Sequence, residues 1–498
     1  MRALLYSVLL IVLFDSCRDT LPVGVASDLS PDIWPDYKDV TIPYNISPLN
    51  FELMHPSSGA YAVFSAADKE FIVKAKKRKF ELPASQWEKL TKAATGHCIT
   101  ITILAKDKEW VRLRPFRFYV ADEPADAYIA YRLIEPGYAL WGQMGIYQRD
   151  ISTFTEIAIM ENRLTGGNCM NCHSFCMQNP DRMLFHLRDL YAGTLIVQGD
   201  YIEKLDTKTA QTVSPLVYPS WHPSGDFVAF SVNQTKQAYH INHPNRVEVY
   251  DEASDVVVYD VKKHEIVTTP PLSSPDVLET FPAFSPDGKR LYYCSAQTLP
   301  MPQSFEEVKY SLCAIAFNPE TRSFGTIIDT LYQAEKEGKS VSFPRVSPDG
   351  KYLMFTVSGY GNFSIWHQDA DLYMLDITSG KYFPLEELNS EYAESYHSWS
   401  SNSRWVVFGS RRMDGLYTHP YIAYINAEGK ASKPFLLPQK DTDFYRRFLK
   451  SYNIPEFITG KVKDRKREFA LKAKKDSGQK VGFVRMGTRV GDQREQGK

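Results

Sequence analysis

The sequence predicts an all-β protein: a six-bladed β-propeller preceded by a small β-sandwich-like domain. Three observations support this fold class. A turn followed by a short apolar strand recurs along the chain, and apolar and polar residues alternate in the region before these repeats. The chain also has 498 residues, of which 43% are hydrophobic and 13% aromatic, so it is long enough for a large core or several domains.

The N-terminus has the features of a bacterial export signal. Arg2 is followed by an apolar run over residues 3–14 and then by a small residue and Cys17. The run is too short to span a bilayer, which takes about 20 residues. A small residue before a cysteine is typical of lipoprotein signals. We therefore expect residues 1–17 to be a signal, Cys17 to be lipidated, and residues 18–39 to tether the chain to a membrane of the cell envelope, in the periplasm or at the outer membrane.

The region 40–121 has the alternation of a β-sandwich-like domain. Its plausible helix is Pro83 to Ala94, with Ser85 as the cap and Trp87 and Leu90 on one face. The predicted strands lie near residues 61–64, 70–73, 99–104 and 116–120.

The propeller is predicted over residues 126–440, with strand pairs following five similar turns. In these turns Pro presets the bend, Asp hydrogen-bonds its own backbone and Gly accepts a positive φ. A sixth unit is inferred from Tyr131 to Ile157. Each unit has the length of a four-stranded blade. The five turns are Asn179-Pro180-Asp181-Arg182, Pro223-Ser224-Gly225-Asp226, Ser285-Pro286-Asp287-Gly288, Ser347-Pro348-Asp349-Gly350 and Ser401-Asn402-Ser403.

The end of the chain differs in charge from the rest. The formal net charge is -1, yet residues 461–498 contain 13 basic and 5 acidic residues. We expect a C-terminal helical segment over 441–472 and a basic, disordered tail over 473–498. No nucleic-acid-binding module is recognisable, and no nucleic-acid partner is expected.

The run Cys169-Met170-Asn171-Cys172-His173 matches the attachment signature of a c-type haem. In that chemistry Cys169 and Cys172 form thioethers with one haem c, and His173 is the proximal iron ligand. Two other interpretations remain open. The cysteines could form a disulfide or dithiol, or they could bind zinc together with His173 and Cys176.

The position of the motif before the turn at Pro180 predicts a loop between blades, at one rim, where a haem edge would be accessible. The candidate distal ligands are Met177, Met183 and His186, and the last two face opposite sides of one strand. His222 is a further option. Cys294 and Cys313, on neighbouring predicted strands, either form a disulfide or are buried as separate thiols.

The turn-and-strand units resemble the TolB-type β-propeller repeat. The segment from Tyr131 through the cysteine motif to Arg188 is similar to exported lipoproteins of Bacteroidetes that join such a propeller to one Cys-x-x-Cys-His motif and are often labelled automatically as cytochrome c biosynthesis proteins. The resemblance implies six blades. It implies little about activity, because that family is uncharacterised.

Three functions are compatible with these features. The first is an exported, lipid-anchored haem protein that exchanges electrons with a redox partner or envelope protein. The second is a non-enzymatic TolB-like envelope scaffold with a structural disulfide, and the third is a propeller enzyme acting on a glycan or small metabolite. No nucleophile elbow, phosphate loop, zinc-protease or dinucleotide signature is present in the sequence, so no catalytic residue is assigned and a catalyst is less expected than an electron-transfer or binding protein.

Overall fold

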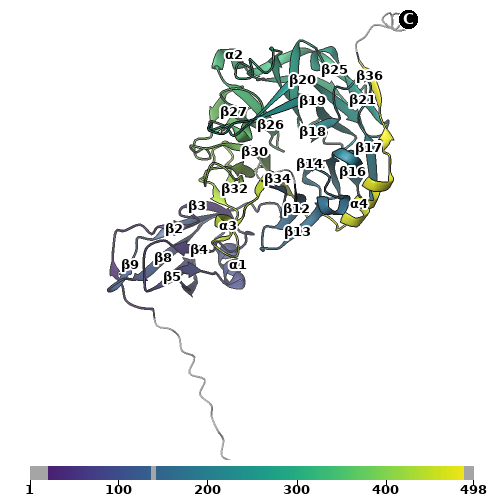
Figure 1. Ribbon diagram of the computed structural model, residues 1–498. Coiled ribbons are helices and arrows are strands. Elements are labelled where there is room, and N and C mark those ends of the chain that lie inside the picture. Colours follow the sequence, from purple (N-terminus) through teal and green to yellow (C-terminus); the bar gives the residue numbers. More distant parts are fainter. Residues whose placement is uncertain (1–20, 136–141, 487–498) are drawn as a thin grey trace, which may run out of the picture.

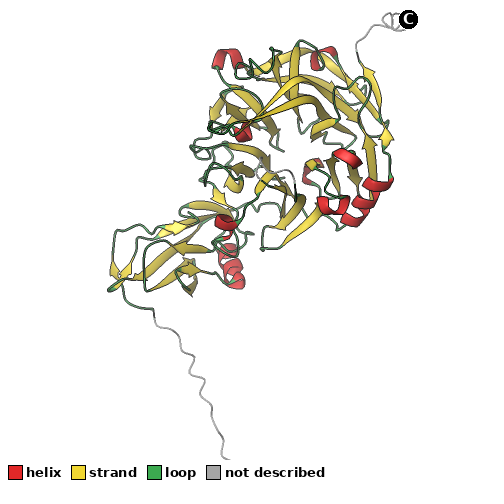
Figure 2. Cartoon of the chain, in the orientation of Figure 1, coloured by secondary structure: helices red, strands yellow, loops and turns green. Residues whose placement is uncertain are grey.

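A computed structural model describes residues 21–135 and 142–486. The predicted signal and Cys17 lie outside these residues. The fold is all-β and propeller-like, with sheets arranged around a centre and a separate group of N-terminal sheets beside them, near β32 and α3 (Figures 1 and 2). Within the described ranges, no helix is both long and apolar enough to cross a membrane.

The N-terminal region consists of two sheets and a helix. The helix is α1 (Ala84–Ala93). The smaller sheet has the order β2-β4-β7, from β2 (Ile33–Trp34), β4 (Phe51–Leu53) and β7 (Lys79–Phe80). The larger sheet has seven strands, β1 (Val25–Ala26), β3 (Val40–Pro43), β5 (Gly59–Ala66), β6 (Lys69–Lys74), β8 (Cys98–Lys106), β9 (Trp110–Arg112) and β10 (Phe116–Ala121).

The two N-terminal sheets share one apolar core. Phe51 of the smaller sheet contacts Phe64 and Phe116 of the larger one, with ring centroids 6.3 Å apart in both pairs. The alternation of buried and half-buried residues along β5 is the pattern that the sequence predicted. The expected tether over 18–39 is wrong for its described part, because β1 and β2 pair with strands of these sheets.

The helix predicted over residues 83–94 is confirmed, but its cap is not Ser85. Pro83 occupies the N-cap position and no side chain caps the helix. Trp87 and Leu90 are buried as expected. The indole of Trp87 donates a hydrogen bond to the carbonyl of Ile46, at 2.9 Å, and its ring meets that of Phe118 edge-on.

Replacing Trp87 with Ala is therefore expected to lower the free energy of unfolding by about 3–5 kcal/mol, because a fully buried aromatic side chain is lost. Trp87→Phe keeps most of the buried area and loses the hydrogen bond, so it should cost about 0.5–1.5 kcal/mol for the bond in addition to a smaller packing loss. Chemical denaturation followed by circular dichroism measures both. Equal losses in the two variants would contradict this packing.

The remaining described strands form six sheets, numbered I to VI here. Sheet I has the order β34-β11-β12-β13, from β11 (Tyr128–Ile134), β12 (Gly145–Asp150), β13 (Glu156–Glu161) and β34 (Ser451–Ile458). Sheet II contains β14 (Met170–Phe175), β15 (Arg182–Leu187), β16 (Gly193–Gln198), β17 (Tyr201–Asp206) and β35 (Gln479–Lys480). Sheet III contains β18 (Leu216–Trp221), β19 (Phe227–Tyr239), β20 (Val247–Asp260), β21 (Glu265–Thr268) and β36 (Gly482–Arg485).

Sheets IV to VI are four-stranded meanders in chain order. Sheet IV contains β22 (Val277–Phe284), β23 (Arg290–Gln297), β24 (Ser311–Asn318) and β25 (Ser323–Tyr332). Sheet V contains β26 (Ser340–Val346), β27 (Tyr352–Ser358), β28 (Asp371–Asp376) and β29 (Tyr382–Pro384). Sheet VI contains β30 (Glu394–Trp399), β31 (Trp405–Ser410), β32 (His419–Tyr424) and β33 (Phe435–Leu436). The short helix α2 (Ala334–Glu337) follows sheet IV.

The first strands of sheets II to VI contact one another in order around the centre. β34 lies between β30 and β14 and pairs with β11, so a strand from the end of the chain completes the first sheet. The expected helical segment 441–472 is wrong in this respect. It contains the four-residue α3 (Phe444–Arg447), then β34, and only then the start of α4 (Lys466–Lys475).

The rest of the C-terminal segment runs along the outer edges of sheets II and III, as Figure 1 shows. Phe469 of α4 packs against Phe185, and β35 and β36 pair in parallel with the outermost strands β17 and β21. Lys204 donates hydrogen bonds to the carbonyls of Ala473 and Asp476, both at 2.9 Å. The expected disorder from residue 473 is therefore wrong up to residue 486, and residues 487–498 lie outside the described part.

Candidate functional site in the centre of the sheets

The recurring turns join the first and second strands of sheets II to VI. The carbonyls of Ser285 and Ser347, for example, accept hydrogen bonds from Gly288 and Gly350, and the two glycines have φ near +72°. The turn at Pro180 likewise separates β14 from β15. The cysteine motif before it therefore lies mostly on β14, an innermost strand, and the predicted position on a loop at the rim is wrong.

Each of the six innermost strands contains a bulge at the same place. One residue in each has a φ between 49° and 53°, a conformation that is rare for side chains of this size. The pairing register shifts at this point in every sheet. These six axial bulge residues are Cys172, Tyr218, Phe281, Phe343, Tyr396 and Ile454.

The axial bulge residues converge at the centre. Tyr218 and Phe281 have ring centroids 4.4 Å apart, and the ring of Phe343 lies 4.0 Å from Phe281 and 5.0 Å from Tyr396. Cys172 is the smallest member of the group and is 5% exposed. The centre is therefore filled by side chains, and the second cysteine of the motif belongs to this filling.

His173 follows Cys172 and is 1% exposed. Neither of its ring nitrogens makes a hydrogen bond of normal geometry, although the carbonyl of Ile454 lies close enough to raise its pKa slightly. Burial, followed by the charge of Arg132, lowers the pKa of His173 to about 3, so the imidazole is neutral. Cys172 and His173 line a cavity of about 20 Å³ with Tyr218, Tyr396 and others, which holds about one water.

Cys169 and Cys172 are separate thiols, and so is Cys176. Cys169 is 3% exposed and packs between sheets I and II. Burial raises the pKa of its thiol, while the charges of Arg132 and Arg188 act in the opposite direction. Among the residues that the structure describes, no group of three or more His, Cys, Asp or Glu side chains could hold a metal ion, so the zinc interpretation has no geometric basis.

The candidate distal ligands do not gather beside His173. Met177 is 43% exposed and lines a different pocket, Met183 packs in the core between sheets I and II, and His186 bonds Thr194 Oγ1 through Nδ1 at 2.9 Å. His222 is held by Ser224 and by the carbonyl of Gly288. These four side chains are therefore placed apart from the small cavity.

Another histidine does lie in that cavity and was not singled out from the sequence. His397 lines the cavity with His173 and follows the axial bulge residue of sheet VI, as His173 does in sheet II. Its Nε2 bonds the carbonyl of Met354 at 2.9 Å, and burial lowers its pKa to about 3. The signal for it was the repeat itself, since the dipeptide Tyr396-His397 aligns with Cys172-His173.

Cys294 and Cys313 lie on adjacent strands but face opposite sides of sheet IV. Tyr293 pairs with Cys313 and Cys294 pairs with Leu312, and the two thiols belong to different apolar clusters. They are separate buried thiols, which was one of the two expected arrangements.

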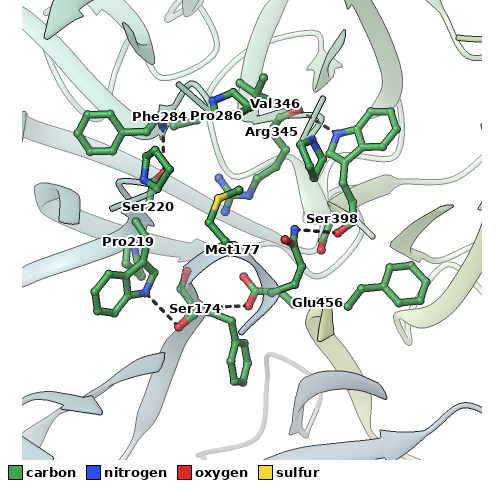
Figure 3. A pocket seen from close by; sticks show the side chains of 18 of the residues that line it. Ser174, Met177, Pro219, Ser220, Phe284, Pro286, Arg345, Val346, Ser398 and Glu456 are labelled. Carbon is green, nitrogen blue, oxygen red and sulfur yellow. Dashed lines mark hydrogen bonds between the residues drawn. The ribbon is translucent and has the colours of Figure 1, made fainter. Parts of the chain in front are cut away.

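A second, larger pocket of about 120 Å³ lies on the same axis, where the innermost strands end; it is called the axial pocket here (Figure 3). Met177, Arg345 and Glu456 project toward its middle in Figure 3. Burial raises the pKa of Glu456 to about 8, which the nearby Arg345 partly offsets, and burial lowers the pKa of Arg345. Sequence reasoning missed Arg345 and Glu456, because a lone charged residue in a strand gives no signal until the strands are arranged around one axis.

Glu279, on the innermost strand β22, is another buried carboxyl group. It is 1% exposed and its Oε2 has no hydrogen-bond partner. Burial, followed by the charge of Asp255, raises its pKa to about 9. The folded state therefore binds this proton more tightly than the unfolded state, in which the pKa is near 4.5.

The stability that Glu279 contributes is thus present below about pH 4.5 and is lost as the pH rises toward 9. Glu279→Gln, which is permanently neutral, should be more stable than the parent at pH 8 by roughly 2–4 kcal/mol and similar to it at pH 4. Urea denaturation at both pH values measures this, with the exposed Glu335→Gln as control. A variant no more stable than the parent at pH 8 would show that the carboxyl group ionises freely.

No protein-family model matches the sequence, and no curated protein sequence matches it. Solved structures show only weak similarity to this chain, in both sequence identity and TM-score. Hydrazine synthase of Kuenenia stuttgartiensis is 11% identical, with a TM-score of 0.44, covering 69% of this chain and 48% of that chain. This chain thus spans about half the length of that protein.

Two further similar structures are a hypothetical selenium-binding protein of Sulfolobus tokodaii and an apocarotenoid oxygenase of Synechocystis. The first is 8% identical, with a TM-score of 0.40, covering 73% of this chain and 97% of that chain. The second is 11% identical, with a TM-score of 0.37, covering 83% and 94% of the respective chains. No property of these proteins is transferred to this chain.

Proposed function

We propose that sheets I to VI are the blades of a six-bladed, TolB-type β-propeller, and that the protein is an exported c-type haem protein which exchanges electrons with a redox partner or envelope protein. Cys169 and Cys172 would carry the haem as thioethers, and His173 would hold its iron. Export and a lipid anchor at Cys17 belong to the same proposal. The six-fold recurrence of the axial bulge supports the blade assignment.

The observation that carries the proposal is the state of His173. A buried imidazole normally has hydrogen-bond partners, because an unsatisfied polar group in the interior costs about 1–3 kcal/mol. The ring of His173 makes no hydrogen bond of normal geometry and is neutral, which is the form that binds a metal. Iron bound to His173 would account for both features; His419 shares them, and the adjacent cysteine pair distinguishes His173.

The other side chains of the motif fit a haem in their chemistry. The two thiols are free, and Arg132 and Arg188 lie close enough to Cys169 to affect its pKa. Two guanidinium groups suit the carboxylate side chains of a haem. When bound, the haem would supply a one-electron redox couple, while the innermost strands keep His173 out of water.

The enclosed space beside His173 is far smaller than a macrocycle. Attachment therefore requires side chains around the cavity to move, and the aromatic axial bulge residues are the nearest ones. Haem-loaded and haem-free protein should consequently differ in near-ultraviolet circular dichroism, where Tyr218 and Tyr396 contribute.

The test is a pyridine haemochrome spectrum of protein produced in a bacterial host with an intact cytochrome c assembly system. We expect the spectrum of a haem with two thioether links, and haem staining that remains on a denaturing gel. Colourless protein from that host would refute the haem proposal and leave the blade assignment untouched.

One observation favours a second candidate, a non-enzymatic interaction scaffold. His397 occupies the position of His173 in sheet VI, and its Nε2 bonds a backbone carbonyl there, so a histidine at this place can be purely structural. On this view Cys172 and His173 are blade residues without a ligand. Unchanged folding and unchanged recovery of binding partners after Cys169→Ala, Cys172→Ala and His173→Ala together would favour the scaffold.

A further inference from the structure

The axial pocket shares Arg345 and Glu456 with the small cavity beside His173, but the haem proposal gives neither residue a role. Its inner wall is a ring of six residues, each the second residue after an axial bulge residue, so every innermost strand contributes one side chain. These residues are Ser174, Ser220, Ala283, Arg345, Ser398 and Glu456. Four members are small, and the other two are an arginine and a glutamate.

Arg345 is half-buried and has no carboxylate partner. Its Nη1 donates a hydrogen bond to the neighbouring carbonyl of Pro344 at 3.1 Å, and its own carbonyl accepts one from the indole of Trp399, also at 3.1 Å. Within the part of the chain that the structure describes, no Asp or Glu oxygen lies within 4.0 Å of its guanidinium. A partly desolvated cation without a direct counter-ion favours an anionic ligand, and a planar guanidinium matches a carboxylate with two parallel hydrogen bonds.

Glu456 lies in the same pocket and is not in contact with Arg345. One of its oxygens, Oε2, accepts a hydrogen bond from the backbone N–H of Phe175 at 3.2 Å. Figure 3 shows the side chains of Arg345 and Glu456 reaching into the pocket from different strands. The space between them is thus bounded by a group that binds anions and by a group that accepts hydrogen bonds.

We propose that the axial pocket binds a small carboxylate that also carries a hydrogen-bond donor, with the carboxylate on Arg345 and the donor on Glu456. The volume of about 120 Å³ is about six times that of the small cavity beside His173, so the pocket has room for a ligand of several non-hydrogen atoms. Short hydroxy and amino acids have this chemistry. The small side chains of Ser174, Ser220 and Ser398 leave the room that the ligand needs.

The experiment is isothermal titration calorimetry of the full-length protein with glycolate, glycine and acetate. We expect saturable binding of glycolate or glycine, and weaker binding of acetate, which lacks the donor. Arg345→Gln should weaken binding roughly 10- to 100-fold, because a charge-assisted contact is lost. Glu456→Met, which removes the acceptor, should keep acetate binding while reducing the advantage of glycolate and glycine.

Arg467→Gln, an exposed change on α4, is the matched control and should bind as the parent does. Because Arg345 is half-buried, each variant is first checked by its melting temperature. If Arg345→Gln fails to fold, Arg345→Lys replaces it; it keeps the charge, lacks the planar fork and should bind more weakly than the parent. No saturable binding of any of the three probes, or equal binding by the parent and the folded Arg345 variant, would overturn the proposal, whatever the haem measurement gives.

Discussion

Replacing Cys169 and Cys172 together with Ser is expected to abolish covalent haem in protein from a host with a cytochrome c assembly system. Each thioether needs a thiol, and serine offers none under these conditions. Haem staining on a denaturing gel should fall to background, and the pyridine haemochrome signal should disappear. Single variants should retain one link, with a shifted haemochrome maximum.

The matched control is Cys176→Ser, which changes a buried cysteine three residues past His173 without altering the motif. It should retain full haem content. His173→Ala keeps both thiols and removes the iron ligand, so its main change should be in the electronic spectrum of any haem attached. Full haem content in the double cysteine variant would contradict attachment at this motif.

Ending the chain at Lys450 is expected to prevent formation of the folded protein. β34 would be lost, and with it the buried side chains of Tyr452 and Phe457 and the pairing partner of β11. Its neighbours β30 and β14 would no longer be connected around the centre. Exposed strand edges and apolar surface of this extent lead to aggregation.

A chain ending at Ser477 is the control, because it keeps β34 and α4 and, among the described elements, loses only β35 and β36. It should elute without aggregation, with a modest decrease in melting temperature. Size-exclusion chromatography and circular dichroism distinguish the two chains. A folded monomer from the chain ending at Lys450 would show that β34 is dispensable.

Local sequence signals predicted the fold class, but they did not predict that β34, from the end of the chain, pairs with β11 in sheet I. Turns such as Ser285-Pro286-Asp287-Gly288 encode their own geometry, because Pro, Asp and Gly each favour one backbone conformation. The segment Ser451-Ile458 has no such signal. Its pairing with β11, about 320 residues earlier, depends on the arrangement of all the sheets between them, so the sequence alone indicated a helical end.

The same distinction applies to the candidate site. The cysteine motif is readable because covalent haem chemistry requires a fixed spacing. Its position on an innermost strand could not be predicted from the sequence. The turn at Pro180 is compatible both with a loop that precedes a sheet and with a hairpin between the first two strands of a sheet. Arg345 and Glu456 line one pocket only when strands from sheets V and I end at the same axis.

The repeated bulge also suggests how the cysteine motif can arise in such a protein. In sheet VI the corresponding run is Ala393-Glu394-Ser395-Tyr396-His397, which already has the histidine in place. Replacing Ala393 and Tyr396 with cysteine would produce a complete Cys-x-x-Cys-His sequence at this position. Sheet VI is thus two residue substitutions from the Cys-x-x-Cys-His sequence, so the motif can arise within such a sheet without the addition of a separate domain.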